Sequence, residues 1–393
     1  MRIAILDMDN LKNPFWRAGQ ARATREVGKR LAKKHQVTVY CTKYPGYLDY
    51  QEDGITYKHI GIVSHSPRIT NAFYLLSLPF VVKKIEADVI LENLNAPTSF
   101  SFTPWFTKIP VVVLPTMLNA REFTRKYFLP FHWLEAKAAK GYKYFLPYSD
   151  TDTAKILRLN PEAIYKKVPQ GVDESFFDIK SKKSKHILFL GRFDLAQKGI
   201  DLLLSAYSLI SDEIKYPLVL AGHGPDEKKI QNLIKKFNLT KKVTIFGPAY
   251  GRSKVDLIRE AAFVVFPSRH DEISLWSLEA LASGLPLVAF DLPESTWMTE
   301  KVCLKSKPFD IENYSQQILT LASDKKLLEK MRKATRPFVR KYKWEDVAKK
   351  IEGFLKYAVE AEQLLEKIRE GNRIKKVSIN YSAFTQDEYE RKA

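Results

Sequence analysis

The sequence predicts two consecutive α/β domains, each built on a doubly wound parallel sheet, and three observations lead to this fold class. The chain has 393 residues, whereas a single domain usually holds about 100–200. Short apolar runs alternate with helix-length segments along both halves, which is typical of βαβ units. The runs 88–92 and 110–114 have continuous rather than alternating apolar residues, as expected of parallel strands covered on both faces.

The first half begins with a strand and returns to short β-branched or apolar runs at regular intervals. The segment 21–34 predicts a helix, because Val27 and Leu31 share one stripe with arginines and lysines around them. A second helix is expected at 71–87, and the capping residues Ser149 and Asp150 predict a third. The expected strands are 2–6, 36–42, 54–60, 88–92, 110–114 and 143–148.

The second half repeats this rhythm after a lysine-rich stretch at 180–185. We expect strands at 186–190, 217–221, 243–246, 263–266 and 287–290, and helices at 199–210, 226–237, from Ser253 with Asp256, and at 275–283. No strand is expected after Glu300, only helices at 324–342 and 344–371. The predicted parts are a first domain (1–172), a second domain (173–340), C-terminal helices (341–371) and a polar tail (372–393).

Bulk composition limits the class of protein. Cys41 and Cys303 lie far apart within or beside apolar runs, which predicts a reducing, cytoplasmic environment without disulfides. The segment 72–82 is the most apolar run, but it is too short to span a bilayer. The formal charge of +19 indicates an anionic partner, and a phosphorylated substrate, an anionic membrane surface and nucleic acid all fit. The alternative to an anionic partner is a basic surface that is simply solvated. The sequence contains no nucleic-acid-binding motif to support nucleic acid as the partner.

Candidate ligand-binding residues follow the strands of the second half, because ligands of open α/β sheets bind at the carboxyl ends of strands. Arg192 and Lys198 flank the first of these turns, and a guanidinium with an ammonium facing one crevice suits a diphosphate. A helix that starts near Leu275 adds its positive end. Each glycine alone is better explained by a plain strand-to-helix turn, but four such turns, two of them with basic residues, favour a site. The four turns are 191–192, 222–225, 247–248 and 268–271.

Two carboxylates stand out in this region. Glu279 lies in an otherwise apolar or small helix, where a carboxylate is costly unless it has partners. Ribose hydroxyls would satisfy it, and a solvent-facing helix position is the alternative. Asp271 precedes it by eight residues, and it either reaches sugar hydroxyls in the same crevice or caps the helix.

These residues resemble those of the retaining glycosyltransferases of family four, which have the GT-B fold. The match is strongest over 185–293 and moderate over 1–173, and five motifs occur in the expected order. In chain order, the motifs are 170–173, then 190–192 together with 197–203, then 221–225, then 267–271 together with 278–288, and finally 343–345. The resemblance implies two Rossmann-like domains facing a cleft, with the C-terminal helices crossing back onto the first domain.

The resemblance also implies a function and residue roles. A hexose would move from a nucleotide sugar, a UDP-sugar or GDP-mannose, to a hydroxyl of a glycan or lipid-linked acceptor, with retention and without a metal or other cofactor. Arg192 and Lys198 would bind the donor diphosphate, Glu279 the ribose and Asp271 the transferred sugar. The remaining donor-side residues would be Gly19, Gly191, Gly222, Gly247, Pro248, Ser274 and Leu275.

The sequence departs from the family pattern at several positions. Asp271 stands where the family usually has Glu, and Glu272-Ile273-Ser274 replaces Gly-Phe-Gly. Thr116 occupies the acceptor-side or sugar-side position where a His is common, and Gly19 is one glycine of the usual pair. These changes keep one alternative open, a non-catalytic nucleotide-sugar-binding protein with a degenerate donor site. A nucleotide-sugar epimerase on the same fold is the other alternative, and the absence of its expected catalytic carboxylates argues against it.

Two further patterns bear on partners. Asp150 and Asp152 form an Asp-x-Asp, but their place after Ser149 favours helix capping over a metal site. The segment 121–133 mixes aromatic and basic residues, which suits a membrane interface, an acceptor groove or a core-packed helix equally. With the basic helix 22–34, it makes the first domain a candidate docking face at the inner face of a membrane.

Overall fold

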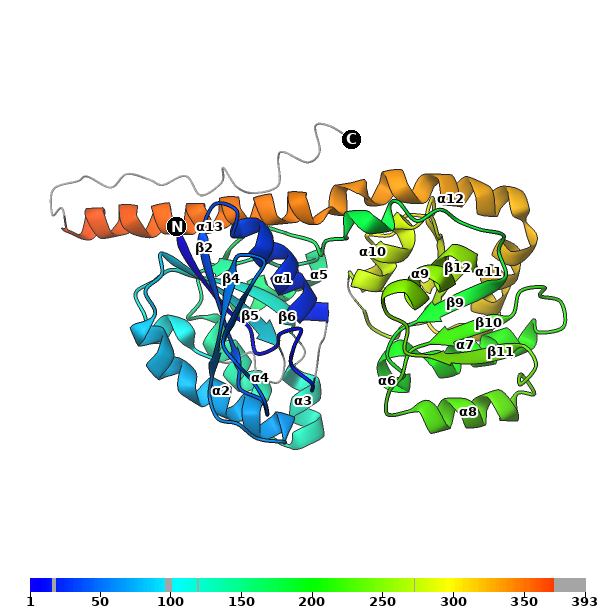
Figure 1. The fold of residues 1–393 in the computed structure, drawn as a ribbon, viewed down its shortest axis with the longest axis horizontal. Helices are drawn as coiled ribbons and strands as arrows, with labels where there is room; N and C mark the ends of the chain where they lie inside the picture. Colours follow the sequence, from blue (N-terminus) through cyan, green and yellow to red (C-terminus); the bar gives the residue numbers. More distant parts are fainter. Residues whose placement is uncertain (16–18, 96–100, 119, 272, 371–393) are drawn as a thin grey trace. The chain divides into compact units, whose positions relative to one another are not determined.

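The computed structural model describes residues 1–15, 19–95, 101–118, 120–271 and 273–370, and the chain divides into two compact units (Figure 1). The first unit holds Met1–Pro169 together with the segment that begins at Glu345, and the second holds Gln170–Trp344. Each unit is built around its own sheet with helices packed against it. The predicted α/β class, with parallel sheets in both halves, is confirmed.

The first sheet has the strand order β3-β4-β2-β1-β5-β6-β7-β8, and only the β3–β4 pair is antiparallel. The order reverses between β1 and β5, so these two strands form the topological switch point of the sheet. Strands β3 and β8 were not predicted, because each is too short to show a pattern. The strands are β1 Arg2–Leu6, β2 Gln36–Thr42, β3 Tyr50–Glu52, β4 Ile55–Ile60, β5 Val89–Asn95, β6 Val111–Met117, β7 Tyr144–Phe145 and β8 Ile164–Tyr165.

Helices cover both faces of this sheet, because right-handed crossovers in opposite directions place α1 on one face and α2, α4 and α5 on the other (Figure 1). Helix α2 begins at Pro67, four residues before the prediction, since proline is favoured in a first turn. The helices are α1 Gly19–Leu31, α2 Pro67–Val81, η1 Val82–Lys84, η2 Thr103–Trp105, α3 Ala120–Tyr127, α4 Phe131–Ala139, α5 Asp150–Leu159 and α13 Trp344–Glu370.

Helix α13 packs on the first unit at the amino ends of its strands. Glu352 lies 3.1 Å from the Nε2 atom of His35, which precedes β2. Glu362 accepts hydrogen bonds of 2.8 Å from Lys143 and Tyr144. The opposite, carboxyl edge of the sheet is therefore free of this helix.

A buried carboxyl group at the switch point of the first sheet gives a pH-dependent prediction. Glu92 accepts hydrogen bonds from Ser101, Thr103 (2.8 Å) and Tyr142 (2.8 Å), and burial raises its pKa above the usual range. As pH rises above the ordinary glutamate pKa, the unfolded chain ionises first, so this residue lowers the free energy of unfolding until pH passes the folded pKa. We expect Glu92→Gln to remove that slope, which amounts to at most about 1.4 kcal/mol per pH unit.

Chemical denaturation of wild type and Glu92→Gln between pH 4 and pH 7, values roughly spanning the carboxyl range, tests this. The exposed Glu122→Gln variant measures how much of any change comes from the loss of one surface charge. Parallel stability curves for wild type and Glu92→Gln would show that burial does not couple this carboxyl group to unfolding.

The second sheet is entirely parallel, with the order β11-β10-β9-β12-β13-β14. Its order reverses between β9 and β12, which again defines a switch point. The expectation of no strand after Glu300 was wrong, because β14 pairs with β13 at the edge. The strands are β9 His186–Leu190, β10 Leu218–Ala221, β11 Val243–Gly247, β12 Ala261–Phe266, β13 Leu287–Phe290 and β14 Cys303–Ser306.

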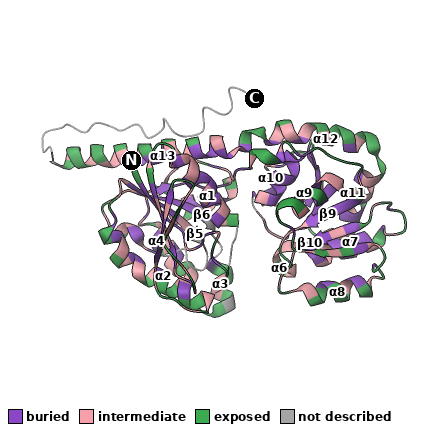
Figure 2. Ribbon diagram, in the orientation of Figure 1, coloured by how far each residue is buried: buried purple, intermediate pink, exposed green. Residues whose placement is uncertain are grey.

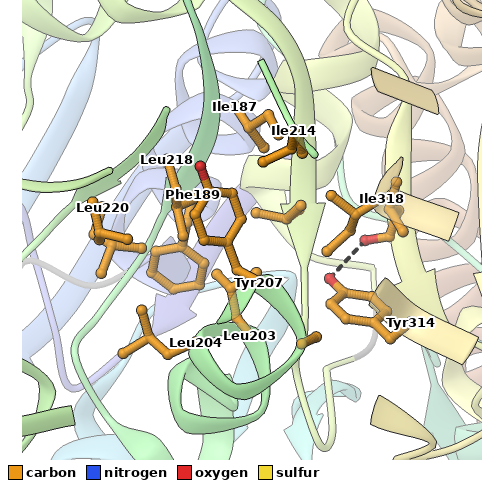
Figure 3. Packing of buried hydrophobic residues seen from close by; sticks show 14 of the residues in the cluster. Ile187, Phe189, Leu203, Leu204, Tyr207, Ile214, Leu218, Leu220, Tyr314 and Ile318 are labelled. Carbon is orange, nitrogen blue, oxygen red and sulfur yellow. Dashed lines mark hydrogen bonds between the residues drawn. The ribbon is translucent and has the colours of Figure 1, made fainter. Parts of the chain in front are cut away.

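A large apolar core fixes the helices of this unit to the sheet. Phe189 of β9 packs with Leu203, Leu204 and Tyr207 on one side, and the Tyr314 hydroxyl donates to the Val288 carbonyl oxygen over 3.1 Å (Figure 3). The helices are η3 Glu174–Phe176, α6 Leu195–Lys198, α7 Ile200–Leu209, α8 Glu227–Lys236, α9 Gly251–Glu260, α10 Leu275–Ala282, η4 Pro293–Ser295, α11 Ile311–Ser323, α12 Lys325–Val339 and η5 Arg340–Tyr342.

Two motifs that are far apart in sequence meet within the second unit. A Cβ atom at Gly171 would lie 2.2 Å from the Trp344 ring, so only glycine lets the backbone lie against that indole. The Val172 amide donates to the Tyr342 carbonyl oxygen over 2.8 Å. The motifs 170–173 and 343–345 therefore contact each other, and this contact joins the first and last segments of the second unit.

Candidate functional site

The candidate site is the carboxyl edge of the second sheet, around the switch point between β9 and β12. Because all six strands are parallel, the segments that follow β9, β10, β11 and β12 open on the same edge. Gly191 and Arg192 follow β9, and Asp271 lies five residues after β12. The two innermost predicted segments thus flank the switch point.

Lys198 and Asp271, both predicted site residues, form an ion pair. Lys198 ends α6, and its ammonium bonds the Asp271 carboxylate, which also accepts a 3.3 Å hydrogen bond from Ser268. The two side chains are 18% and 14% exposed, so one side of the pair still reaches solvent. A ligand anion that approached Lys198 would meet a cation already held in place by Asp271.

Arg269 links the same two segments from the other side. Its guanidinium makes two bonds to the Asp201 carboxylate, of 2.8 and 2.7 Å, which is the strong bidentate geometry. Its amide donates to the Gln197 carbonyl oxygen over 2.8 Å. Arg269 therefore fixes the segment after β12 to α6 and α7 and orients Lys198 toward Asp271.

Arg192 is the most open of the predicted cations. Its side chain is 56% exposed, and one nitrogen, Nη2, bonds Asp194 at 2.7 Å and Gln197 at 3.0 Å. A guanidinium has five N–H donors, so donors remain for an anion at this edge. Removing Arg192 should cost the fold little, because exposed ion pairs contribute about 0–1 kcal/mol.

Glu279 is buried in α10, and its partner was not predicted. The carboxylate bonds the ammonium of Lys254, which belongs to α9. The rings of Phe176 and Trp276 lie 5.1 and 5.3 Å from that ammonium, close enough for cation–π attraction. A single lysine in a chain with 64 lysines and arginines gives no signal in the sequence.

Helix α10 presents its amino end to the same region. Ser274 is its N-cap and accepts a 3.1 Å hydrogen bond from the Ser277 amide, and Leu275 is the first helical residue. The helix is buried along most of its length (Figure 2), which holds this end rigidly. Glu272, the departure from the family pattern, lies outside the described residues.

The predicted glycines differ in what they contact. At Gly222 a Cβ atom would lie 1.9 Å from the Gly191 carbonyl oxygen, whereas at Gly247 nothing lies within 4 Å of it. Both have positive φ, +148° and +83°. Gly222 is therefore explained by packing against Gly191, while Gly247, followed by Pro248, borders open space.

The first unit holds the remaining predicted residues, Gly19 and Thr116. Gly19 begins α1, and Thr116 lies at the carboxyl end of β6. Asp7, directly after β1, is buried, accepts hydrogen bonds from Thr24 and Asn93 (2.8 Å), and has its pKa raised by burial. Asp7 thus joins β1, α1 and β5 at the switch point of this sheet.

The Asp-x-Asp at 150–152 lies in the first turn of α5, whose N-cap is Ser149, so its predicted place at a capped helix start is confirmed. The Asp152 amide donates to the Ser149 hydroxyl over 3.1 Å, and Asp150 pairs with Lys167 at 2.6 Å. Within the described ranges, no group of three or more His, Cys, Asp or Glu side chains is arranged to hold a metal ion.

Comparison with known proteins gives a family-model match in the second half, relatives over part of the chain and a common fold over most of it. Residues 172–338 match the model of the family described as glycosyl transferases group 1. A protein of Methanocaldococcus jannaschii, described as an uncharacterized glycosyltransferase, is 25% identical over 218 residues, which are 52% of this chain and 59% of that protein. A second such protein of the same organism is 35% identical over 104 residues, 26% of either chain. The matches thus span 59% or less of these relatives.

Two solved structures share the fold. Sucrose-phosphate synthase from Thermosynechococcus elongatus superposes with a TM-score of 0.76 at 18% identity, covering 92% of this chain and 99% of that one. The Anabaena protein HepE, solved in complex with UDP-glucose, superposes with a TM-score of 0.72 at 13% identity, covering 91% and 100%. The predicted GT-B fold is confirmed.

Proposed function

Through residues 172–338 the chain belongs to the glycosyl transferases group 1, and we propose that it transfers a hexose from a nucleotide sugar to a hydroxyl of a glycan or lipid-linked acceptor. The observation that supports this most is the Lys198–Asp271 ion pair at the carboxyl edge of the second sheet, with Arg192 directly after β9 and Glu279 in the helix that follows β12. Two cations and two carboxylates on the segments that follow β9 and β12 match the two ends of a nucleotide sugar, a diphosphate and hydroxyl-bearing rings.

The donor would lie along the carboxyl edge with its diphosphate near Lys198 and Arg192. As the bond between the sugar and the diphosphate breaks, negative charge grows on the leaving phosphate oxygen. Fixed cations at that point stabilise the transition state more than the ground state. In this proposal Arg192 and Lys198 do the work that a divalent metal does in other transferases, and retention of the anomeric configuration is proposed with it.

The carboxylates would bind hydroxyl groups. Asp271, held beside Lys198, would accept hydrogen bonds from the transferred sugar. Glu279 would accept from the ribose, with Lys254 compensating its charge while the site is empty. The open space beside Gly247 and Pro248 would take the base. The HepE structure, a complex with UDP-glucose, supports testing a uridine donor first.

A thermal-shift screen against UDP, GDP, ADP and their sugar conjugates tests the donor site. A nucleotide at a hundred times its Kd should stabilise the protein by about 2.7 kcal/mol. We expect one base to shift wild type and to shift Arg192→Ala and Glu279→Gln much less, because the first variant loses a diphosphate cation and the second loses the carboxylate charge that strengthens hydrogen bonds from the ribose.

Arg252→Ala is the matched control, since Arg252 is almost fully exposed on α9 of the same unit. Its shift should equal that of wild type. A screen without any shift would contradict the proposed donor site. A shift without release of nucleoside diphosphate in the presence of glycan or lipid-linked acceptors would favour the non-catalytic binding protein.

A further inference from the structure

Helix α2 carries a stripe of apolar side chains that faces away from the core of the first unit. The α2 stripe consists of Ile69, Phe73, Leu76 and Phe80, which are 45%, 42%, 64% and 70% exposed. Their spacing of four, three and four residues places them on one face of the helix. A different face of the helix packs on the core, through the buried residues Thr70, Tyr74 and Leu78. A surface helix ordinarily keeps its outer face polar, so this face indicates an interaction surface.

Basic residues lie at both ends of the α2 stripe. Arg68 is exposed in the first turn, and Lys83 and Lys84 are exposed in η1, directly after the helix. Helix α2 itself contains no acidic residue. The surface is therefore an apolar strip with cations at its ends.

The same surface continues over η2 and α4. The Lys83 ammonium lies 5.9 Å from the ring of Phe106, just after η2. The Lys137 ammonium of α4 lies 6.0 Å from the Trp105 ring and 5.1 Å from the Trp133 ring. Both tryptophans are exposed, and Figure 2 shows exposed segments along α2 and α3. Paired tryptophans and lysines are typical of side chains at a membrane interface.

The turn between α3 and α4 adds a second, independent observation. Phe128 is 91% exposed, and the adjacent Leu129 is also exposed. The backbone of Phe128 has a φ of +55°, a conformation that bulky L-residues avoid. Packing within the described unit does not compensate the strain of this conformation, because the Phe128 ring is exposed to solvent.

We propose that the α2 stripe, Phe128, Leu129 and the two tryptophans dock the protein on a bilayer that contains anionic phospholipid. Apolar side chains would enter the headgroup boundary while the lysines contact phosphate groups. Among residues 1–169 there are 25 lysines and arginines against 14 aspartates and glutamates, an excess of 11, which complements an anionic surface. A second copy would place the same cations opposite one another, which is unfavourable.

The basic helix α1, the other half of the docking face expected from the sequence, does not contribute in the same way. Arg25 pairs with Asp53 at 2.7 Å, and Arg30 with Glu26 at 2.6 Å. Its cations are largely balanced within the unit. No helix in the described part of the chain is long and apolar enough to cross a membrane.

Vesicle flotation tests the proposal with the full chain and vesicles of phosphatidylcholine, with and without phosphatidylglycerol. Wild type should float with the anionic vesicles only. Leu76→Glu/Phe80→Glu should lower the partition coefficient at least about tenfold, since two apolar side chains no longer enter the boundary. Lys83→Gln/Lys84→Gln should lower it about fivefold per lysine, the factor that corresponds to ~1 kcal/mol each.

Leu209→Glu is the matched control, because Leu209 is also an exposed leucine (56%, against 64% for Leu76) and lies at the end of α7 in the second unit. It should float like wild type, and circular dichroism melts should confirm that each variant is folded. Wild type that stays unbound, or stripe variants that float equally well, would overturn the proposal. Self-association abolished by the stripe substitutions without flotation would assign the surface to a second copy instead. The nucleotide screen reports the donor site separately, so the two proposals fail independently.

Discussion

Lys198→Ala should lower kcat for sugar transfer about 10²–10³-fold, the usual effect of removing one transition-state donor, while the protein stays folded. The ammonium is the proposed neighbour of the leaving diphosphate, and Asp271 together with the Arg269–Asp201 bridge holds its position. Because charge on the leaving group grows as the bond breaks, the loss should fall mainly on kcat rather than on KM. Steady-state rates with the nucleotide sugar identified by the shift screen measure it.

Lys305→Ala provides a control with the same burial. Lys305 is also 18% exposed and pairs with Asp291 at 3.0 Å, but it lies on β14, at the far edge of the second sheet. We expect its rate to stay within a few-fold of wild type, about 1 kcal/mol at most. Equal losses in both variants would assign the effect to stability, and an unchanged rate in Lys198→Ala would remove Lys198 from the proposed mechanism.

Much of the second sheet could be predicted because most of its strands are short apolar runs, and β9, β10 and β12 are each followed directly by glycine or proline. Strand β9 has the expected bounds 186–190, and β10 and β13 differ by at most one residue. Strand β14 was missed because it is an edge strand of four residues that includes Lys305. A strand that is only half covered needs no continuous apolar run, so its sequence resembles a loop.

Topology alone predicts that the segments carrying the candidate site residues meet at one edge of the sheet. It does not predict the ion pairs that these residues form. Parallel strands bring their carboxyl ends to one edge whatever the side chains are. Lys198 and Asp271 are 73 residues apart, and no periodicity connects them. The role of Lys254 could not be predicted, because only the structure shows that α9 lies beside α10 and that Lys254 pairs with Glu279.

Helix α2 shows a further limit of sequence patterns. Its inner residues, such as Tyr74 and Leu78, and its outer residues, such as Leu76 and Phe80, are all apolar. The 3.6-residue period therefore indicates a helix without telling which face packs on the sheet. Only the structure separates the core face from the exposed stripe.

Gly222→Ala should lower the free energy of unfolding by about 3 kcal/mol or more, whereas Gly247→Ala should cost only about 1 kcal/mol, the ordinary penalty of positive φ. A methyl group at Gly222 would stand 1.9 Å from the Gly191 carbonyl oxygen, so the ends of β9 and β10 would have to separate. The Gly222 amide, which donates to the Gly247 carbonyl oxygen over 2.8 Å, would move with them. Chemical denaturation of the two variants measures the difference.

The same pair separates packing from ligand binding at the site. A methyl group at Gly247 meets nothing within 4 Å of the Cβ position in the protein, so it would occupy space that the proposal assigns to the base. Gly247→Ala should therefore raise the Kd for nucleotide about tenfold or more, a loss of ~1.4 kcal/mol, while remaining nearly as stable as wild type. If nucleotide affinity is unchanged in Gly247→Ala, the base does not lie against this turn, and the donor must bind nearer to β12.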